Sequence, residues 1–131
     1  MASRITIQWT TTAKESLKKL PRKVSKGLLD KADQLAQCDD PRKYCKPLTG
    51  PLEGYYRITY GRYRAVFTVT EERLATGDVL LHLRVIFVVA GIRKEFDRHD
   101  VYNVAKKLVE QVLPALSEDI DDFELREKEA D

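Results

Sequence analysis

Residues 47–67 are the part of the chain that most restricts its fold, because their pattern is typical of a β-hairpin. The stretch opens with prolines and glycines, which favour turns, and continues as two short aromatic and β-branched segments separated by Gly61. Because side chains alternate along a strand, Arg57 is expected to face away from its apolar neighbours, and Arg62 and Arg64 likewise. The sequence therefore predicts a hairpin with one apolar face and one arginine-bearing face that attracts phosphate.

The remaining pattern surrounds this hairpin with strands and helices. Residues 4–10 alternate as a half-buried strand does, and residues 79–90 are a long apolar strand. Residues 12–15 fit a capping box and predict a helix start, and Pro21 separates this helix from a second one that runs to about Gln37. The order β-α-α-β-β-β-α predicts an α+β domain: a small antiparallel sheet, covered on one face by helices, with an N-terminal helical hairpin and a C-terminal helix.

The C-terminal third is expected to hold a turn, a helix and a tail. Residues 70–78 are typical of a turn, and Asp97 or Asp100 is a candidate N-cap for the last helix. The apolar face of that helix comprises Val101, Val104, Ala105, Leu108, Val112 and Leu113. Residues 1–116 are then the folded domain, and residues 117–131 an acidic tail that is expected to be flexible.

Composition excludes several classes of protein. A chain of 131 residues, 43% hydrophobic and 34% charged, is typical of one soluble domain, and no apolar run is long enough to cross a bilayer. Cys38 and Cys45 are too few for a disulfide framework and lack neighbouring metal ligands, so we expect reduced thiols in a cytoplasmic protein.

The net charge of +2 conceals an uneven distribution. The tail, residues 117–131, carries eight acidic and two basic residues, so its charge is −6 and that of the remaining chain is +8. A basic body suits a polyanionic partner, although surplus lysines that merely solvate helix faces are the simpler explanation. The tail either occupies the basic surface in competition with RNA or only solubilises the protein.

The chain lacks the motifs of several enzyme classes. It has no glycine-rich phosphate loop, only two histidines, and no serine or cysteine in a recognisable nucleophile motif. Arginines and tyrosines on a sheet remain, and they suit metal-independent cleavage of RNA, in which the 2′-OH attacks the adjacent phosphate. No metal ion or cofactor is therefore expected.

Several segments resemble the RelE/ParE superfamily of type II toxins, over roughly residues 5–108. The hairpin segments are Lys46-Pro47-Leu48, Gly54-Tyr55-Tyr56-Arg57-Ile58 and Tyr63-Arg64-Ala65-Val66-Phe67. The later segments, which look like the closing strand and C-terminal segment of the RelE branch, are Val88-Val89-Ala90-Gly91-Ile92-Arg93-Lys94 and Asp100-Val101-Tyr102. The superfamily includes both mRNA endonucleases and gyrase poisons.

The resemblance implies a role for four residues. Arg57 falls where the family often has a lysine that contacts the scissile phosphate, and Arg64 matches a phosphate clamp. Arg93 matches a second clamp on the transition state, and Tyr102 matches the tyrosine that stacks on, or acts near, the cleaved nucleotide. Read without the resemblance, the arginines could be ordinary solvated charges and Tyr102 a core residue.

Two departures from the family pattern stand out. Thr59 occupies a position where a second lysine is often found, and the spacing from Arg93 to Tyr102 is longer than usual. Lys94, Arg98 and His99 are therefore possible substitutes for Tyr102. His99 has an ordinary pKa suited to proton transfer near pH 7, although a cap or surface role is the simpler explanation, and the pKa of an arginine is too high for a general base. The RNA-binding candidates are Lys94, Arg62, Arg98 and Thr59.

The resemblance thus implies an endoribonuclease toxin that cuts mRNA on the ribosome and is held inactive by a cognate antitoxin protein. The expected products carry a 2′,3′-cyclic or 3′-phosphate and a 5′-OH. Two alternatives remain: a ParE-like inhibitor of DNA gyrase, and a degenerate member of the fold that only binds antitoxin or RNA.

Overall fold

The computed structural model describes residues 3–74, 80–94 and 100–112 of the chain. The strands and helices in chain order are β1 (Ser3–Trp9), α1 (Thr11–Lys18), α2 (Arg22–Leu35), β2 (Lys46–Pro47), β3 (Tyr55–Tyr60), β4 (Tyr63–Leu74), β5 (Leu80–Ile92) and α3 (Val101–Lys107). The short helical turns are η1 (Pro41–Lys43), η2 (Gly50–Leu52) and a π-helical turn, η3 (Leu108–Val112). The predicted order is confirmed, and the two-residue β2 is the only strand or helix added to it within the described residues.

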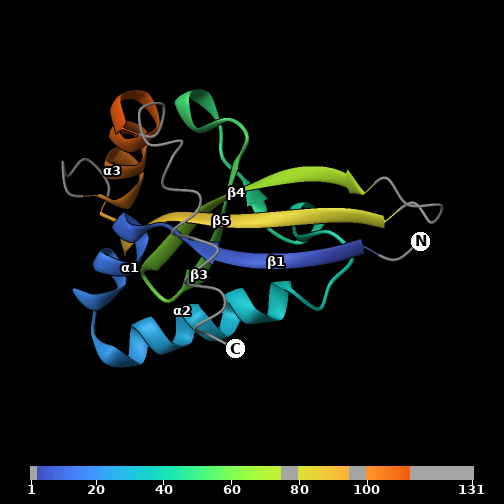
Figure 1. The fold of residues 1–131 in the computed structure, drawn as a ribbon. Coiled ribbons are helices and arrows are strands. Elements are labelled where there is room, and N and C mark those ends of the chain that lie inside the picture. Colours follow the sequence, from blue (N-terminus) through green and yellow to red (C-terminus); the bar gives the residue numbers. More distant parts are fainter. Residues whose placement is uncertain (1–2, 75–79, 95–99, 113–131) are drawn as a thin grey trace.

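The strands form one sheet in the order β1-β5-β4-β3-β2 (Figure 1). The predicted α+β class is confirmed, but the sheet is not antiparallel throughout, because β1 runs parallel to β5 from Ser3 beside Leu81 to Trp9 beside Phe87. Alternation of apolar and polar residues reveals that a strand has a buried face and says nothing of its direction. The sequence pattern therefore could not predict this pairing.

Helices cover both faces of the sheet, whereas the sequence predicted only one covered face. The α1–α2 hairpin packs on a core that includes Trp9, Phe67 and Phe87. The α3 helix lies on the opposite face, where Val101 and Ala105 pack with valines of β4 and β5 (Figure 1). The arginine-bearing face of the β3–β4 hairpin is thus partly covered as well, because Val66 on this face belongs to a second, smaller core under α3.

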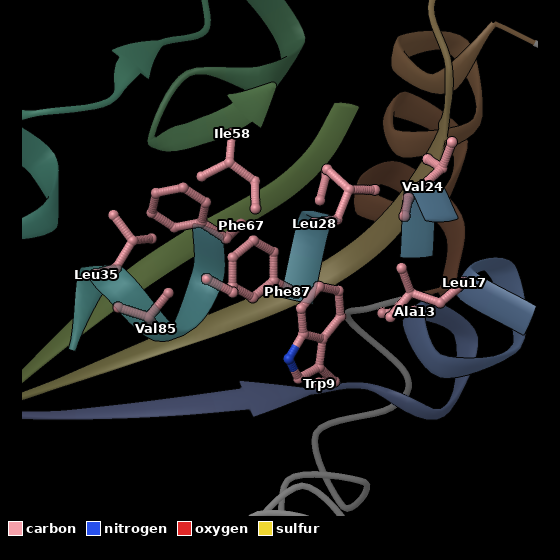
Figure 2. Packing of buried hydrophobic residues seen from close by; sticks show 13 residues of the cluster. Trp9, Ala13, Leu17, Val24, Leu28, Leu35, Ile58, Phe67, Val85 and Phe87 are labelled. Atoms are coloured by element: carbon pink, nitrogen blue, oxygen red, sulfur yellow. The ribbon is translucent and has the colours of Figure 1, made fainter. Parts of the chain in front are cut away.

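Aromatic rings form the centre of the larger core (Figure 2). The rings of Trp9 and Phe87 are stacked with centroids 4.1 Å apart, and Phe67 lies 5.0 Å from Phe87 in a tilted arrangement. Burial of each such side chain contributes about 1.5–3 kcal/mol to the stability of the fold. Helix α2 approaches the sheet closely at Gly27, where a Cβ atom would lie 2.3 Å from the ring of Tyr60.

The first helix starts earlier than its capping box predicts. Thr10 is the N-cap, and its hydroxyl oxygen accepts a hydrogen bond from the Ala13 N–H at 2.9 Å. The Thr10 N–H donates to the Phe87 carbonyl at 3.0 Å, so the end of β1 is held by β5 and the helix follows at once. The second helix ends at Leu35, two residues before the predicted end at Gln37.

The β3–β4 hairpin turns at Gly61, as predicted, with a positive φ of 58°. The predicted turn at residues 70–78 is wrong for its first half, because β4 continues to Leu74 and pairs there with Leu80. Pairing with the 13-residue β5 outweighs the weak local turn preference of these residues. Residues 75–79 lie outside the described residues, as do Asp97, Leu113 and the acidic tail.

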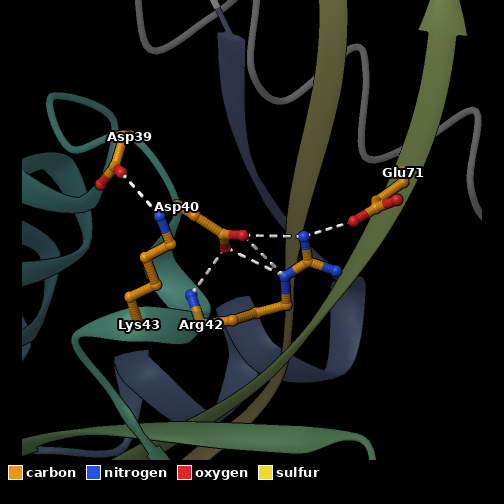
Figure 3. Close-up of polar contacts among 5 residues, drawn as sticks. All are labelled: Asp39, Asp40, Arg42, Lys43 and Glu71. Carbon is orange, nitrogen blue, oxygen red and sulfur yellow. Dashed lines mark hydrogen bonds and ion pairs between the residues drawn. The ribbon is translucent and has the colours of Figure 1, made fainter.

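Ion pairs hold the connection between α2 and β2 (Figure 3). Arg42 donates to both carboxylate oxygens of Asp40 and pairs with Glu71 of β4, and Lys43 pairs with Asp39 at 3.0 Å. The hydrogen bonds from Arg42 lower the pKa of Asp40 below its ordinary value of 3.8. The pKa of Asp40 is thus lower in the folded protein than in the unfolded chain. The ionised carboxylate therefore stabilises the fold fully at pH values above its pKa in the unfolded chain, and this stabilisation is lost as the pH falls through its pKa in the folded protein.

We therefore expect Asp40→Asn to lower the free energy of unfolding by about 1–2 kcal/mol at pH 7, because charge-assisted hydrogen bonds are lost. Urea denaturation should show this difference unchanged down to about pH 5 and shrinking once the pH falls below about 4. Asp33→Asn, at an exposed position of α2, is the control and should have little effect at any pH. A destabilisation that is the same at pH 3 and pH 7 would contradict the electrostatic explanation.

Candidate functional site

The β3–β4 hairpin places Arg57 and Arg64 on one face of the sheet, as the sequence predicted, whereas Arg62 lies in the turn between the two strands. In the antiparallel register Arg57 lies opposite Val66, and Thr59 lies opposite Arg64. Residues opposite each other in a ladder point to the same face, so Arg57, Thr59 and Arg64 share a face. Val66 packs with α3, and this face is therefore the one that α3 covers in part.

The last strand brings Arg93 to the same end of the molecule. The Arg93 N–H donates to the Arg62 carbonyl at 2.8 Å, which ties the end of β5 to the hairpin turn. At Gly91 a Cβ atom would lie 3.3 Å from the Cβ atom of Val101, so the start of α3 packs closely on β5. This close packing of α3 on β5 brings the side chains at the start of the helix within reach of those that follow the strand.

The carboxylate of Asp100 lies between Arg93 and the start of α3. Asp100 as a whole is only 2% exposed. One oxygen, Oδ1, pairs with Arg93 Nη1 at 2.8 Å and accepts a hydrogen bond from the Lys94 N–H. The other, Oδ2, accepts from the Tyr102 N–H at 3.1 Å, so Asp100 is the N-cap that the sequence suggested. One buried carboxylate thus holds both the arginine that leaves β5 and the helix that carries Tyr102.

Tyr102 contacts two of the predicted arginines. Its hydroxyl oxygen accepts a hydrogen bond from Arg57 Nη1 at 2.9 Å. The guanidinium carbon of Arg93 lies 4.7 Å from the centre of the Tyr102 ring, which is the geometry of a cation–π contact. We call Arg57, Arg93 and Tyr102 the arginine–tyrosine cluster. The longer spacing from Arg93 to Tyr102 does not separate these side chains.

Arg64 lies next to this cluster on the sheet and makes different contacts. Its Nη1 donates to the carbonyl oxygens of Gly61 at 2.8 Å and Tyr63 at 3.0 Å, so part of its guanidinium is held at the hairpin turn. Its Nε is buried and has no hydrogen-bond partner within the described part of the chain. A buried donor without a partner costs free energy.

The other predicted site residues are less closely associated with the cluster. Thr59 is half-buried beside Arg64, whereas the side chains of Arg62 and Lys94 are exposed. Arg98 and His99 lie outside the described residues, so both stay predictions. Asp100 was expected only as a helix cap, and its contact with Arg93 was missed, because no sequence pattern showed that the six intervening residues bring the two together.

The cluster therefore concentrates positive charge on a partly covered sheet face. Arginine remains charged at all working pH values, and its planar fork suits paired hydrogen bonds to a phosphate. Within the described residues, no group of three or more histidine, cysteine, aspartate or glutamate side chains could hold a metal ion. Among the same residues, no helix is long and apolar enough to span a membrane.

Replacement of Asp100 should destabilise the fold in proportion to the contacts it removes. We expect Asp100→Ala to lower the free energy of unfolding by about 2–4 kcal/mol, because it removes a helix cap and leaves Arg93 without this carboxylate. Asp100→Asn keeps an oxygen for the cap and should cost less. Urea denaturation measures both, and Asp30→Ala, at an exposed position of α2, is the control. Equal stability of Asp100→Ala and Asp30→Ala would contradict the role of this carboxylate.

Comparison with known proteins identifies a family to which the sequence is similar. The family model described as "ParE toxin of type II toxin-antitoxin system, parDE" matches residues 7–86. No curated protein matches the chain.

Two solved toxin–antitoxin complexes contain a similar chain. A chain of the RelBE2 complex of Mycobacterium tuberculosis is 27% identical, with a TM-score of 0.53, and the alignment covers 67% of this chain and 96% of that one. A chain of the intact RelBE complex of E. coli is 20% identical, with a TM-score of 0.48 and coverage of 69% and 98%. Because the family model matches more than half of the sequence, the protein belongs to the ParE toxin family, within the RelE/ParE superfamily of type II toxins.

Proposed function

We propose that this toxin is an endoribonuclease that cleaves mRNA by attack of a 2′-OH on the adjacent phosphate. The observation that supports the proposal is the arginine–tyrosine cluster, in which Tyr102 contacts Arg57 through its hydroxyl and Arg93 through its ring. Two guanidinium groups around one aromatic ring offer a binding place for both parts of a nucleotide, the phosphate and the base.

In the proposed reaction the 2′-oxygen forms a bond to phosphorus while the bond from phosphorus to the 5′-oxygen of the next nucleotide breaks. The products are a 2′,3′-cyclic phosphate and a 5′-OH. Arg57 and Arg93 neutralise the charge that develops on the phosphate oxygens, and Arg64, on the same face of the sheet, adds to the positive charge there. Because these cations are side chains of the protein, the proposed step assigns no role to a metal ion.

The 2′-OH must lose a proton and the 5′-oxygen must gain one. The ordinary pKa values of arginine and tyrosine lie well above 7, so neither is suited to accept the proton at neutral pH. His99, close to the cluster in sequence, is the proposed proton acceptor, because its ordinary pKa is suited to transfer near pH 7. The departing 5′-oxygen takes its proton from water in the proposed step. The ring of Tyr102 is proposed to hold the base next to the cleaved bond.

The proposed partners follow from the family and from the charge of the chain. Both similar solved chains come from complexes of a toxin with its antitoxin, and we propose a cognate antitoxin that covers the cluster. The charge of +8 before residue 117 suits RNA, and the proposed substrate is mRNA on the ribosome, in the cytoplasm.

Inhibition of DNA gyrase is the second candidate function. It is favoured by the family model, which is that of ParE toxins and whose matched residues, 7–86, end before Arg93 and Tyr102. A toxin that only binds gyrase does not need the arginine–tyrosine cluster. Loss of toxicity on substitution of the arginines therefore distinguishes the two functions.

The deciding experiment is cleavage of an mRNA on programmed ribosomes by purified protein. We expect specific cuts by the wild type and a loss of about 100- to 1,000-fold in Arg64→Ala and in Arg93→Ala, because each removes a donor to the developing charge. Arg73→Ala removes an exposed arginine from the far end of the same strand as Arg64 and is the matched control. It should cut like the wild type.

Three results would contradict the proposal. Cuts that survive both substitutions would remove the assigned role of the arginines. A folded wild-type protein that cuts no mRNA but inhibits gyrase supercoiling would establish the second function. A protein with neither activity that still binds antitoxin would be the degenerate member of the fold.

A further inference from the structure

A cleft outside the arginine–tyrosine cluster lies at the edge of the sheet, where β2 ends after two residues and β3 continues. Its volume is about 470 Å³, within the usual range of roughly 300–1,000 Å³ for small-ligand sites. We call it the edge cleft. It is lined by Lys31, Gln34 and Leu35 of α2, by Cys38, Tyr44 and Cys45 in the connection that follows, by Lys46 of β2, and by Arg57, Ile58 and Thr59 of β3.

The charge of the edge cleft favours an anion. Lys31, Lys46 and Arg57 are its charged lining residues, and none of the lining residues is acidic. The nearby carboxylates Asp39 and Asp40 are each paired with a cation of the connection, Lys43 or Arg42 (Figure 3). The Arg57 guanidinium is bonded to Tyr102 on the face that α3 covers, so Lys31 and Lys46 are the cations that we assign to the cleft, and they favour a phosphate-bearing ligand over a neutral one.

The aromatic residue of the cleft indicates a base in addition to a phosphate. Tyr44 is 67% exposed, and among the described residues it is the one large hydrophobic side chain that is exposed. A hydrogen bond with Asp39 raises the pKa of Tyr44 above its ordinary value of 10.0. The η1 turn next to it is fixed to β4 by the ion pair of Arg42 with Glu71. An exposed ring on a fixed backbone is suited to stack on an unpaired base.

The floor and walls of the cleft suit the remaining parts of a nucleotide. Leu35, Ile58 and the half-buried Cys45, whose thiol pKa burial raises to about 11, provide apolar surface and no negative charge at neutral pH. Gln34 provides a side-chain amide that can form hydrogen bonds with the edge of a base or with a ribose hydroxyl.

Arg57 connects the edge cleft to the cluster. It lines the cleft and also donates to the Tyr102 hydroxyl at 2.9 Å. A strand whose cleaved phosphate lies at the cluster would therefore place a neighbouring nucleotide in or near the cleft. We propose that the edge cleft binds one nucleotide of single-stranded RNA that flanks the cleaved bond, with its base stacked on Tyr44 and its phosphates near Lys31 and Lys46. This inference rests on the proposed function and extends it to a second position on the substrate.

Equilibrium binding of a fluorescein-labelled 2′-O-methyl oligouridylate of about ten nucleotides tests the inference, since this probe cannot be cleaved by 2′-OH attack. We expect Tyr44→Ala to weaken binding about ten-fold, the loss of one stacked base, whereas Tyr44→Phe keeps the affinity. The double variant Lys31→Ala, Lys46→Ala should reduce the slope of log affinity against log salt by about 1.4. Lys18→Ala, Lys23→Ala, at exposed positions on α1 and α2, is the matched control with an unchanged slope.

Failure of the inference and failure of the proposed function can be distinguished. If the wild type cuts mRNA but Tyr44→Ala and the Lys31, Lys46 variant bind the probe as the wild type does, the edge cleft is not a nucleotide site and the endoribonuclease stands. If the wild type cuts nothing but binds the probe with the expected dependence on Tyr44, the cleft inference stands without the catalytic proposal. Absence of any probe binding overturns the cleft inference directly.

Discussion

The pairing of β4 with β5 is the interaction on which the rest of the structure depends. It runs from Tyr63 beside Ile92 to Leu74 beside Leu80 and forms the centre of the sheet. On one face it supplies the aromatic core under the α1–α2 hairpin, and on the other the valines under α3. The same ladder places Arg64 of β4 opposite Gly91 of β5, two residues before Arg93, so the pairing that forms the fold also positions the candidate site.

The candidate site depends on a single buried carboxylate. Asp100 binds Arg93 and caps the helix that carries Tyr102, and Tyr102 in turn contacts Arg57. A carboxylate that is 2% exposed has a large desolvation cost, which its three hydrogen-bond partners offset. Arg57 and Arg93 are therefore held in place by the fold, and the proposed cleavage would use them as preorganised positive charge.

Much of this arrangement could be predicted from the sequence, because alternation in the β3–β4 hairpin and the helical spacing after Asp100 are local signals. The shared face of Arg57 and Arg64 was predicted in this way and is confirmed, and of the two predicted cap candidates, Asp97 and Asp100, the structure has Asp100 as the cap. The parallel pairing of β1, the position of α3 on the second face and the contact of Asp100 with Arg93 depend on packing between distant segments. Tyr44 lies in a connection without periodicity, so only its exposure and its neighbours in space single it out.

The central claim is that the cluster acts on a phosphate attacked by the neighbouring 2′-OH. It is tested most directly by replacing a single ribose with 2′-deoxyribose at the mapped cleavage position of an mRNA on programmed ribosomes. The account predicts that cleavage at that position disappears while any cuts at unmodified positions persist, because the nucleophile has been removed. Cleavage that continues at the deoxyribose would contradict the account, since the nucleophile would then have to be water or a side chain of the protein.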